Sequence, residues 1–505
     1  MVTAALLVAM TVTAMEQLVV SPAMTTIIAQ LRGFDIYPWV ISAYLLAATV
    51  STPIYGKLAD LYGRKRVLLF GLVLFSLGSV LSGTAMSMGQ LIAMRTLQGL
   101  GAGAVGPIVL TLLGDLFTLK ERARVQGLFS AVWGLSSVAG PIIGGYLTES
   151  PSFGWRWVFL VSVPFAAVAI AMLAWYVKEP SINRKVAPID WAGAGLLTAG
   201  LASLLLIVLD GSRHGIMVSA AIAGTSVVTL VLFVIREQHA ADPILPMDLM
   251  TRPTIAASLI GSGLIGAILF GIETYIPLYV QGVHGGDARL AGKMLMPLFM
   301  SWAISVAVAA RAVVHRGFRF GALIGSSLIT IGSLGLVLGA LFPEWYRFGF
   351  YPGLVLVGLG MGPTSLSLIL AVQHSVTWGQ RGVATGAVIL LRTIGGALGV
   401  GLLGAALGWE LAHRLASAGA SGIDVTAALR PETHKMLTPD QLAIVQAQLG
   451  NTLRDVYLQM AALGIGTMLC ALWLPNKHAT LTSAEAKDRD DLDDDEALAV
   501  AASEL

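Results

Sequence analysis

The sequence predicts an all-α membrane protein, and three observations support this fold class. Hydrophobic residues make up 56% of the 505 residues and charged residues only 12%, which leaves too little polar surface to cover a soluble globule. Apolar segments of about 20 residues, the length of a membrane-spanning helix, recur along the chain. Lys and Arg gather in the connections on one side, as they do in membrane proteins of fixed orientation. We therefore expect lipid bilayer, and no nucleic acid, around this chain.

Fourteen apolar segments are long enough to cross a bilayer. Their approximate ranges are 2–28, 38–58, 67–87, 90–114, 123–148, 156–177, 190–210, 216–235, 254–280, 289–313, 320–341, 349–373, 381–408 and 453–474. The first segment lacks a basic leader and a small-residue cleavage site, so we expect it to be a span of the mature protein. An even number of spans places both termini on the same side of the membrane.

The orientation follows from the positive charges. Short connections on the side of residues 56–66 carry most of the Lys and Arg residues found between spans. Cytoplasmic loops of membrane proteins carry such an excess. We therefore expect both termini to lie in the cytoplasm.

The spans fall into groups. Residues 1–187 and 241–474 each hold six spans, and residues 188–240 hold two spans without Pro or embedded charge. This organisation is typical of transporters built from repeats around a site in the middle of the membrane. By parity, residues 409–452 form an external loop, and the charged stretch 475–505 is expected to be a disordered cytoplasmic tail.

Four ionisable residues lie well inside predicted spans: Glu16, Arg95, Glu273 and Arg392. A charge in the middle of a bilayer costs roughly 2.5 to 3.5 kcal/mol, so such residues face a bundle interior or a water-filled cavity. The functional interpretation is that all four take part in proton coupling. The structural alternative is an ion pair, such as Glu16 with Arg95, that locks helices together.

An acid whose surroundings change with conformation can bind and release a proton in each cycle. A cationic compound would compete with that proton for Glu16 or Glu273, so we expect these two acids to bind an amphipathic, cationic substrate. Aromatic side chains such as Tyr275 and Trp133 can stack on a cationic ligand. Core packing or lipid contact is the alternative for each aromatic residue.

The fifth span carries a run of small residues with one proline. Gly134, Gly140 and Gly144 allow a neighbouring helix to approach closely, and Pro141 removes a backbone hydrogen bond and permits bending. We expect these four residues to form a helix hinge, with ordinary close packing as the alternative.

These motifs resemble those of the major facilitator superfamily, and within it the fourteen-span bacterial drug:proton antiporter family of the EmrB and QacA type. The matching stretches are Gly56 to Arg66, Arg95 to Gly103, Gly134 to Gly145, Pro277 to Val283 and Leu391 to Gly399. Two positions depart from the pattern, because Leu61 replaces a frequent Arg and Glu16 stands where the family usually has Asp.

The resemblance implies a major facilitator fold of two six-helix bundles plus two extra transmembrane helices, in the inner membrane of a bacterium. It implies proton coupling through Glu16 and Arg95, with Glu273 and Arg392 as further candidates. It also implies a cytoplasmic conformational latch whose members are Gly56, Asp60, Gly63, Arg64 and Asp115. The carboxylate of Asp60 would pair with the positive end of a neighbouring helix.

The expected function is export of amphipathic compounds by alternating access, as a monomer, with the proton gradient as the only energy source. No metal or cofactor is expected, and no Gly-x-x-x-x-Gly-Lys-[Ser/Thr] run is present for direct use of ATP. An envelope adaptor protein stays open as a partner. The alternatives are a lipid or siderophore exporter, an importer, and, from another class, a non-transporting membrane sensor or assembly factor.

Overall fold

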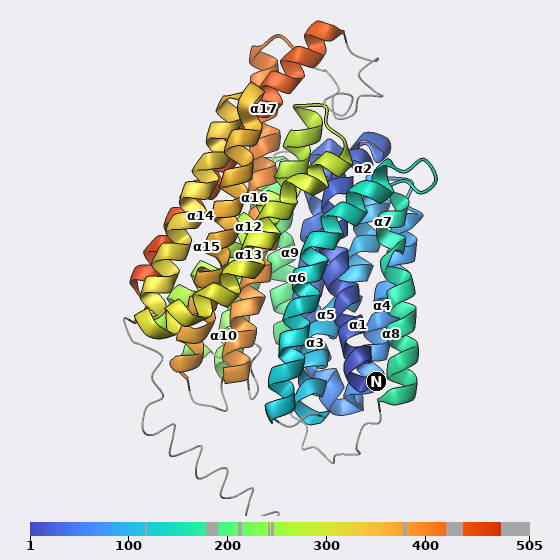
Figure 1. Cartoon of the computed structure of the whole chain (residues 1–505), viewed down its shortest axis with the longest axis vertical. Helices are drawn as coiled ribbons and strands as arrows, with labels where there is room; N and C mark the ends of the chain where they lie inside the picture. Colours follow the sequence, from blue (N-terminus) through green and yellow to red (C-terminus); the bar gives the residue numbers. More distant parts are fainter. Residues whose placement is uncertain are drawn as a thin grey trace, which may run out of the picture.

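The computed structural model describes residues 1–116, 119–177, 190–210, 215–240, 243, 247–376, 381–420 and 438–475. These residues form helices and short connections, with no strand among them. The helices run side by side along one long axis (Figure 1). Ten helical segments in the described ranges are long and apolar enough to cross a membrane, and the shorter apolar helix Trp191–Ile207 adds to them. The all-helical membrane class expected from composition is confirmed.

The amino-terminal half is built from eight α-helices and two short 3₁₀ helices. They are α1 (Val2–Val19), η1 (Ser21–Ala23), α2 (Met24–Leu31), η2 (Phe34–Ile36), α3 (Pro38–Tyr62), α4 (Arg64–Gly83), α5 (Met88–Leu116), α6 (Leu119–Glu149), α7 (Arg156–Leu160) and α8 (Ser162–Tyr176). The first predicted span is interrupted at Ser21 and Pro22, where a proline cannot donate its backbone hydrogen bond to the preceding turn. The chain end at Met1 marks the lower end of the molecule in Figure 1, and α2 lies at the upper end.

The carboxy-terminal half repeats this arrangement. It consists of α11 (Met247–Met250), α12 (Pro253–Gly282), α13 (Ala288–Arg316), α14 (Phe318–Leu341), η4 (Pro343–Trp345), α15 (Tyr346–His374), α16 (Arg381–Ser417) and α17 (Pro439–Leu472). Helices α13 and α14 pack on α15 as α3 and α4 pack on α5, and α12 packs on α16 and α17 as α1 packs on α6 and α8. Gly63 and Gly317 hold the equivalent turns, both with φ +95, a backbone conformation that favours glycine.

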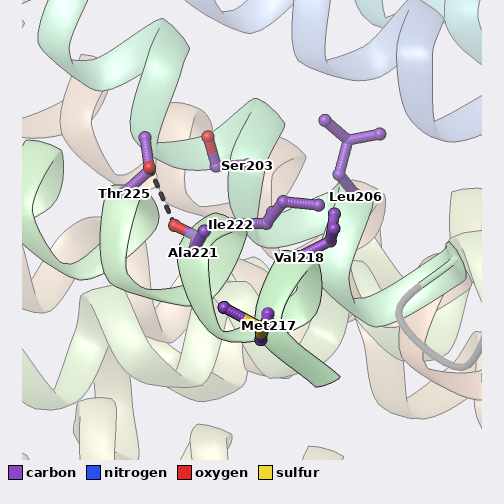
Figure 2. Close-up of a pocket in the computed structure, with 7 residues that line it drawn as sticks. All are labelled: Ser203, Leu206, Met217, Val218, Ala221, Ile222 and Thr225. Carbon is purple, nitrogen blue, oxygen red and sulfur yellow. Dashed lines mark hydrogen bonds between the residues drawn. The ribbon is translucent and has the colours of Figure 1, made fainter. Parts of the chain in front are cut away.

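Two helices, α9 (Trp191–Asp210) and α10 (Ile216–His239), stand between the halves in the sequence. Helix α9 contacts both α3 and α16, and therefore both halves, whereas α10 packs mainly on α9. An open apolar groove of about 370 Å³ lies between α9 and α10 (Figure 2). Its lining includes Leu206, Met217 and Ile222, and the Thr225 hydroxyl there already donates to the carbonyl of Ala221. The groove thus presents apolar surface suited to lipid.

The predicted external loop at 409–452 requires a correction. Helix α16 continues to Ser417 and α17 begins at Pro439, so much of the stretch extends the two helices, which are 37 and 34 residues long. At about 1.5 Å per residue both exceed the roughly 30 Å of a bilayer core. Their ends project at the top of Figure 1. Helix α17 starts with a capping box between Thr438 and Gln441. Residues 421–437, and the predicted tail beyond residue 475, lie outside the described residues.

Exposed tryptophans lie near both ends of the bundle. Trp175 and Trp473 are exposed close to the lower ends of α8 and α17, and Trp345 and Trp409 are exposed at the upper ends of α15 and α16. Tryptophan is enriched where membrane proteins meet the lipid headgroups. These residues therefore support a bilayer crossed by the helices between them.

Candidate functional site

Glu16 and Arg95 form a buried ion pair in the amino-terminal half. Arg95 Nη1 on α5 lies 2.7 Å from Glu16 Oε1 on α1, and the exposed fractions of the two side chains are 3% and 0%. The Arg95 guanidinium also lies over the Tyr44 ring, 4.0 Å from its centroid. Each buried charge is thus compensated by the other, which is the condition for tolerating both in an apolar interior.

A hydrogen-bonded network extends this pair to two further helices. Arg95 Nη1 also donates to Gln98 Oε1 at 2.7 Å, and Gln98 Nε2 donates to Ser79 Oγ on α4 at 2.9 Å. On the other side, Ser162 Oγ on α8 donates to the second carboxylate oxygen of Glu16 at 3.1 Å. The site therefore joins α1, α4, α5 and α8. Any change in the charge of the Glu16 carboxylate would act directly on Arg95.

Sequence reasoning missed Gln98, Ser79 and Ser162. Gln98 follows Arg95 by three residues and so shares its helix face, a signal that was available. The serines carried no such signal, because hydroxyls in apolar helices commonly bond to a carbonyl of their own helix, as Thr96 does here with Ile92.

Glu273 on α12 has a different environment from Glu16. Its side chain is 6% exposed, and no hydrogen bond or ion pair to its carboxylate is found among the described residues. Its backbone carbonyl accepts a hydrogen bond from the Ser21 hydroxyl of η1, so this turn of α12 faces the amino-terminal half. The structure therefore places at the junction of the two halves an acid for which the described residues supply no counter-charge.

No ion pair or ring contact among the described residues links Arg392 or Tyr275 to the Glu273 carboxylate. Arg392 on α16 is partly buried, and it forms no ion pair within the described part of the chain. Tyr275 is fully buried and its hydroxyl donates to Val400 O at 2.6 Å. This environment favours a role in core packing over contact with a substrate. The side chain of Trp133 lies outside the described residues.

The glycine and proline face of α6 lies between the two halves. On one side Gly140 and Gly144 pack against Leu18 and Val19 of α1, and a Cβ at Gly140 would lie 2.6 Å from Leu18 Cβ. On the other side the Pro141 carbonyl packs directly on Gly292 of α13. Gly134 lies lower on the same helix, near Ala303 of α13. Close backbone approach on both sides explains why this helix needs small residues.

The predicted latch region is only partly described. Gly63 ends α3, and the buried Arg64 donates from Nη1 to Thr111 O of α5 at 3.1 Å, which ties the start of α4 to the lower end of α5. Gly56 has open space around its α-carbon. The side chains of Asp60 and Asp115 lie outside the described residues.

Among the described residues, hydrogen bonds between the halves are found in the middle and upper parts of the bundle. Ser42 donates to Ala397 O at 2.9 Å, and Gln281 Nε2 donates to Pro22 O at 3.0 Å. Near the top of α6, Glu149 accepts from the backbone N–H of Ala288 at 3.0 Å. These three bonds join the two halves in the part of the chain that the structure describes.

Comparison with known proteins agrees with this architecture. The sequence model of the Major Facilitator Superfamily matches residues 5–400. The chain is 35% identical over 402 residues to Multidrug resistance protein 3 of Bacillus subtilis (strain 168), covering 79% of this chain and 78% of that protein. It is 36% identical over 409 residues to Multidrug transporter protein MdtP of the same organism, covering 80% and 74%.

Solved structures show the same fold at low sequence identity. The crystal structure of a bacterial homolog of the human lysosomal transporter Spinster, inward-facing and unoccupied, superposes with a TM-score of 0.70 and 15% identity, covering 94% of this chain and 97% of that one. The repeated halves, the buried charges and these matches lead to one conclusion. The chain is a multi-pass membrane transport protein that belongs to the Major Facilitator Superfamily.

Proposed function

We propose that this protein exports amphipathic, cationic compounds in exchange for protons by alternating access. The observation that carries the proposal is the buried Glu273 carboxylate, for which the described residues supply no partner. An ionised carboxylate without a partner is strongly disfavoured in such a place, so it must bind either a proton or a cation. Exchange of one for the other, with opposite ends of the molecule open in turn, is antiport.

Glu16 would have the second role in this cycle. A proton on Glu16 removes the charge that pairs with Arg95, and Arg95 then retains Gln98 Oε1 and the carbonyl of Val40 as acceptors among the described residues. Because the pair joins α1 to α5, its protonation state can bias how the helices of the amino-terminal half pack. Glu16 would thus couple the proton to conformation, and Glu273 would select the charge of the substrate.

The finer features of the proposal follow from the sequence. The fourteen predicted spans all coincide with helices, which supports fourteen crossings and the EmrB and QacA type. The distribution of Lys and Arg supports an inner-membrane location with the lower end in the cytoplasm. Two relatives are named for multidrug resistance or transport, which supports drugs or toxic compounds as substrates.

Export of a lipid or siderophore is the second candidate, favoured by the long upper extensions of α16 and α17. Purified protein in liposomes separates the candidates. Flux of cationic, neutral and lipid-like compounds is measured under an imposed pH gradient, with and without a proton uncoupler. We expect uncoupler-sensitive flux of the cationic compounds. Flux that is absent, or that ignores the gradient, would contradict proton antiport.

A further inference from the structure

The Glu149 carboxylate forms a hydrogen bond between the two halves of the protein. Glu149 is the last residue of α6, and its Oε1 accepts the backbone N–H of Ala288, the first residue of α13, at 3.0 Å. The first N–H groups of a helix have no partner inside the helix and carry partial positive charge. A negative side chain of the amino-terminal half thus meets the positive end of a helix in the carboxy-terminal half.

The last turn of α6 contacts the first turn of α13 at two more points. The Arg289 guanidinium lies over the Tyr146 ring, with 5.2 Å between Cζ and the ring centroid. A Cβ at Gly145 would lie 2.5 Å from Ala288 O, so the two backbones are in direct contact. Tyr146 and Glu149 are three residues apart and share one face of α6. The last turn of α6 therefore contacts α13 through a charged group, an aromatic ring and its backbone.

Helix α13 does not depend on Glu149 for its own start. Asp287 is the N-cap residue, and its Oδ1 accepts the backbone N–H of Leu290 at 2.7 Å. This cap lies within one half and persists wherever the other half moves. The bond from Ala288 to Glu149 can therefore break without unfolding the helix.

We propose that Glu149 is a conformational latch that closes the upper end of the transporter and releases when that end opens. This role rests on the export cycle proposed above, because a cycle that opens each end in turn must separate α6 from α13. The negative charge of Glu149 can be tested separately from the aromatic and backbone contacts of the same turn. The Glu149→Gln variant keeps an oxygen acceptor for the Ala288 N–H but loses the negative charge that is attracted to the helix end.

The distance between spin labels at the upper end tests the latch without requiring transport. The full chain carries Cys470→Ser, and spin labels are attached to cysteines at Met86 and Glu344. Met86 belongs to the amino-terminal half and Glu344 to the carboxy-terminal half, and both side chains are exposed in upper turns. In lipid nanodiscs we expect Glu149→Gln to raise the ratio of long to short distances about fivefold, and Glu149→Ala at least as much. Asp440→Asn is the matched control, since Asp440 lies in the first turn of α17 within one half.

Unchanged distances in both Glu149 variants, or an equal change in Asp440→Asn, would overturn the latch. Ala288→Pro is an independent test if the Glu149 variants fold poorly. Proline lacks the N–H donor yet is favoured at the first position of a helix, so the same shift toward long distances is expected. If the shift is seen but liposomes show no proton-driven flux, the latch stands and the export function fails.

Discussion

Glu16 and Gln98 share one nitrogen of Arg95, because the Oε1 atoms of both side chains lie 2.7 Å from Arg95 Nη1. A guanidinium between a charged and a neutral acceptor responds to the charge of the first one. Protonation of Glu16 would therefore weaken the bond from Arg95 to α1 and leave the bond from Arg95 to Gln98, which lies within α5.

Glu16→Gln removes the group that binds the proton while preserving its shape. We expect proton-driven export to be lost and substrate binding to persist, because the amide can still accept from Arg95. The measurement compares flux under a pH gradient with equilibrium binding of a fluorescent cationic compound. Flux at the wild-type rate would exclude Glu16 from proton coupling.

Arg95→Met leaves the Glu16 carboxylate buried without its cation. Breaking a buried pair in this way costs about 3 to 5 kcal/mol, whereas replacing both partners with apolar residues of similar size costs much less. We therefore expect Glu16→Leu/Arg95→Met to unfold at a higher temperature than Arg95→Met alone. Thermal unfolding in detergent measures the difference, and strictly additive losses would show that the two residues are not coupled.

Glu273→Gln is expected to weaken binding of cationic compounds by about tenfold, the loss of roughly 1.4 kcal/mol of charge attraction, and to leave neutral compounds unaffected. Equilibrium binding to the purified protein provides the comparison. Glu344→Gln serves as the control, because Glu344 is an exposed carboxylate of the same half. An equal loss for cationic and neutral compounds would contradict charge recognition by Glu273.

Gly144→Ala introduces a methyl group where α6 touches the backbone of Val19. No flexible side chain is there to move, so α6 and α1 must separate, and we expect transport to fall at least tenfold with some loss of stability. Gly224→Ala in α10 is the control, since nothing lies within 4 Å of a Cβ at that position. If both variants transport normally, α6 has more freedom than its packing indicates.

We expect His284 to make the stability of the upper end depend on pH. It follows the end of α12, and its ring stacks on Tyr346 with 3.9 Å between centroids. Burial, and then the charge of Arg347, lower the pKa of His284 below its ordinary value of 6.5. The unfolded chain therefore binds the proton more readily, so stability is complete above pH 6.5 and falls as the pH drops below it.

His284→Gln should flatten this part of the stability profile, because the substituted side chain does not titrate. Thermal unfolding between pH 5 and pH 8 measures the slope for both proteins. An identical slope in the variant would assign the pH dependence to other groups.

Much of the fold could be predicted from the sequence, because in a bilayer both helix length and hydropathy are fixed by the solvent. The ends of α16 and α17 were not predicted, since the criterion of about 20 apolar residues detects only the part of a helix that lies in lipid. The charged members of the site were visible because Glu16, Arg95 and Glu273 are costly in apolar spans. Which acid has a partner depends on how separate helices pack, and no local pattern records this.

The position of α9 has a mechanical consequence. Helix α9 contacts α3 in one half and α16 in the other. If the halves rotate against each other, as the proposed export cycle requires, α9 cannot keep both contacts fixed and has to slide along at least one of these helices. Leu197 and Leu201 of α9 belong to one apolar cluster with Ala387 of α16, and apolar contacts of this kind can shift without the loss of a directional bond. In that cycle α9 would act as a sliding contact between the halves.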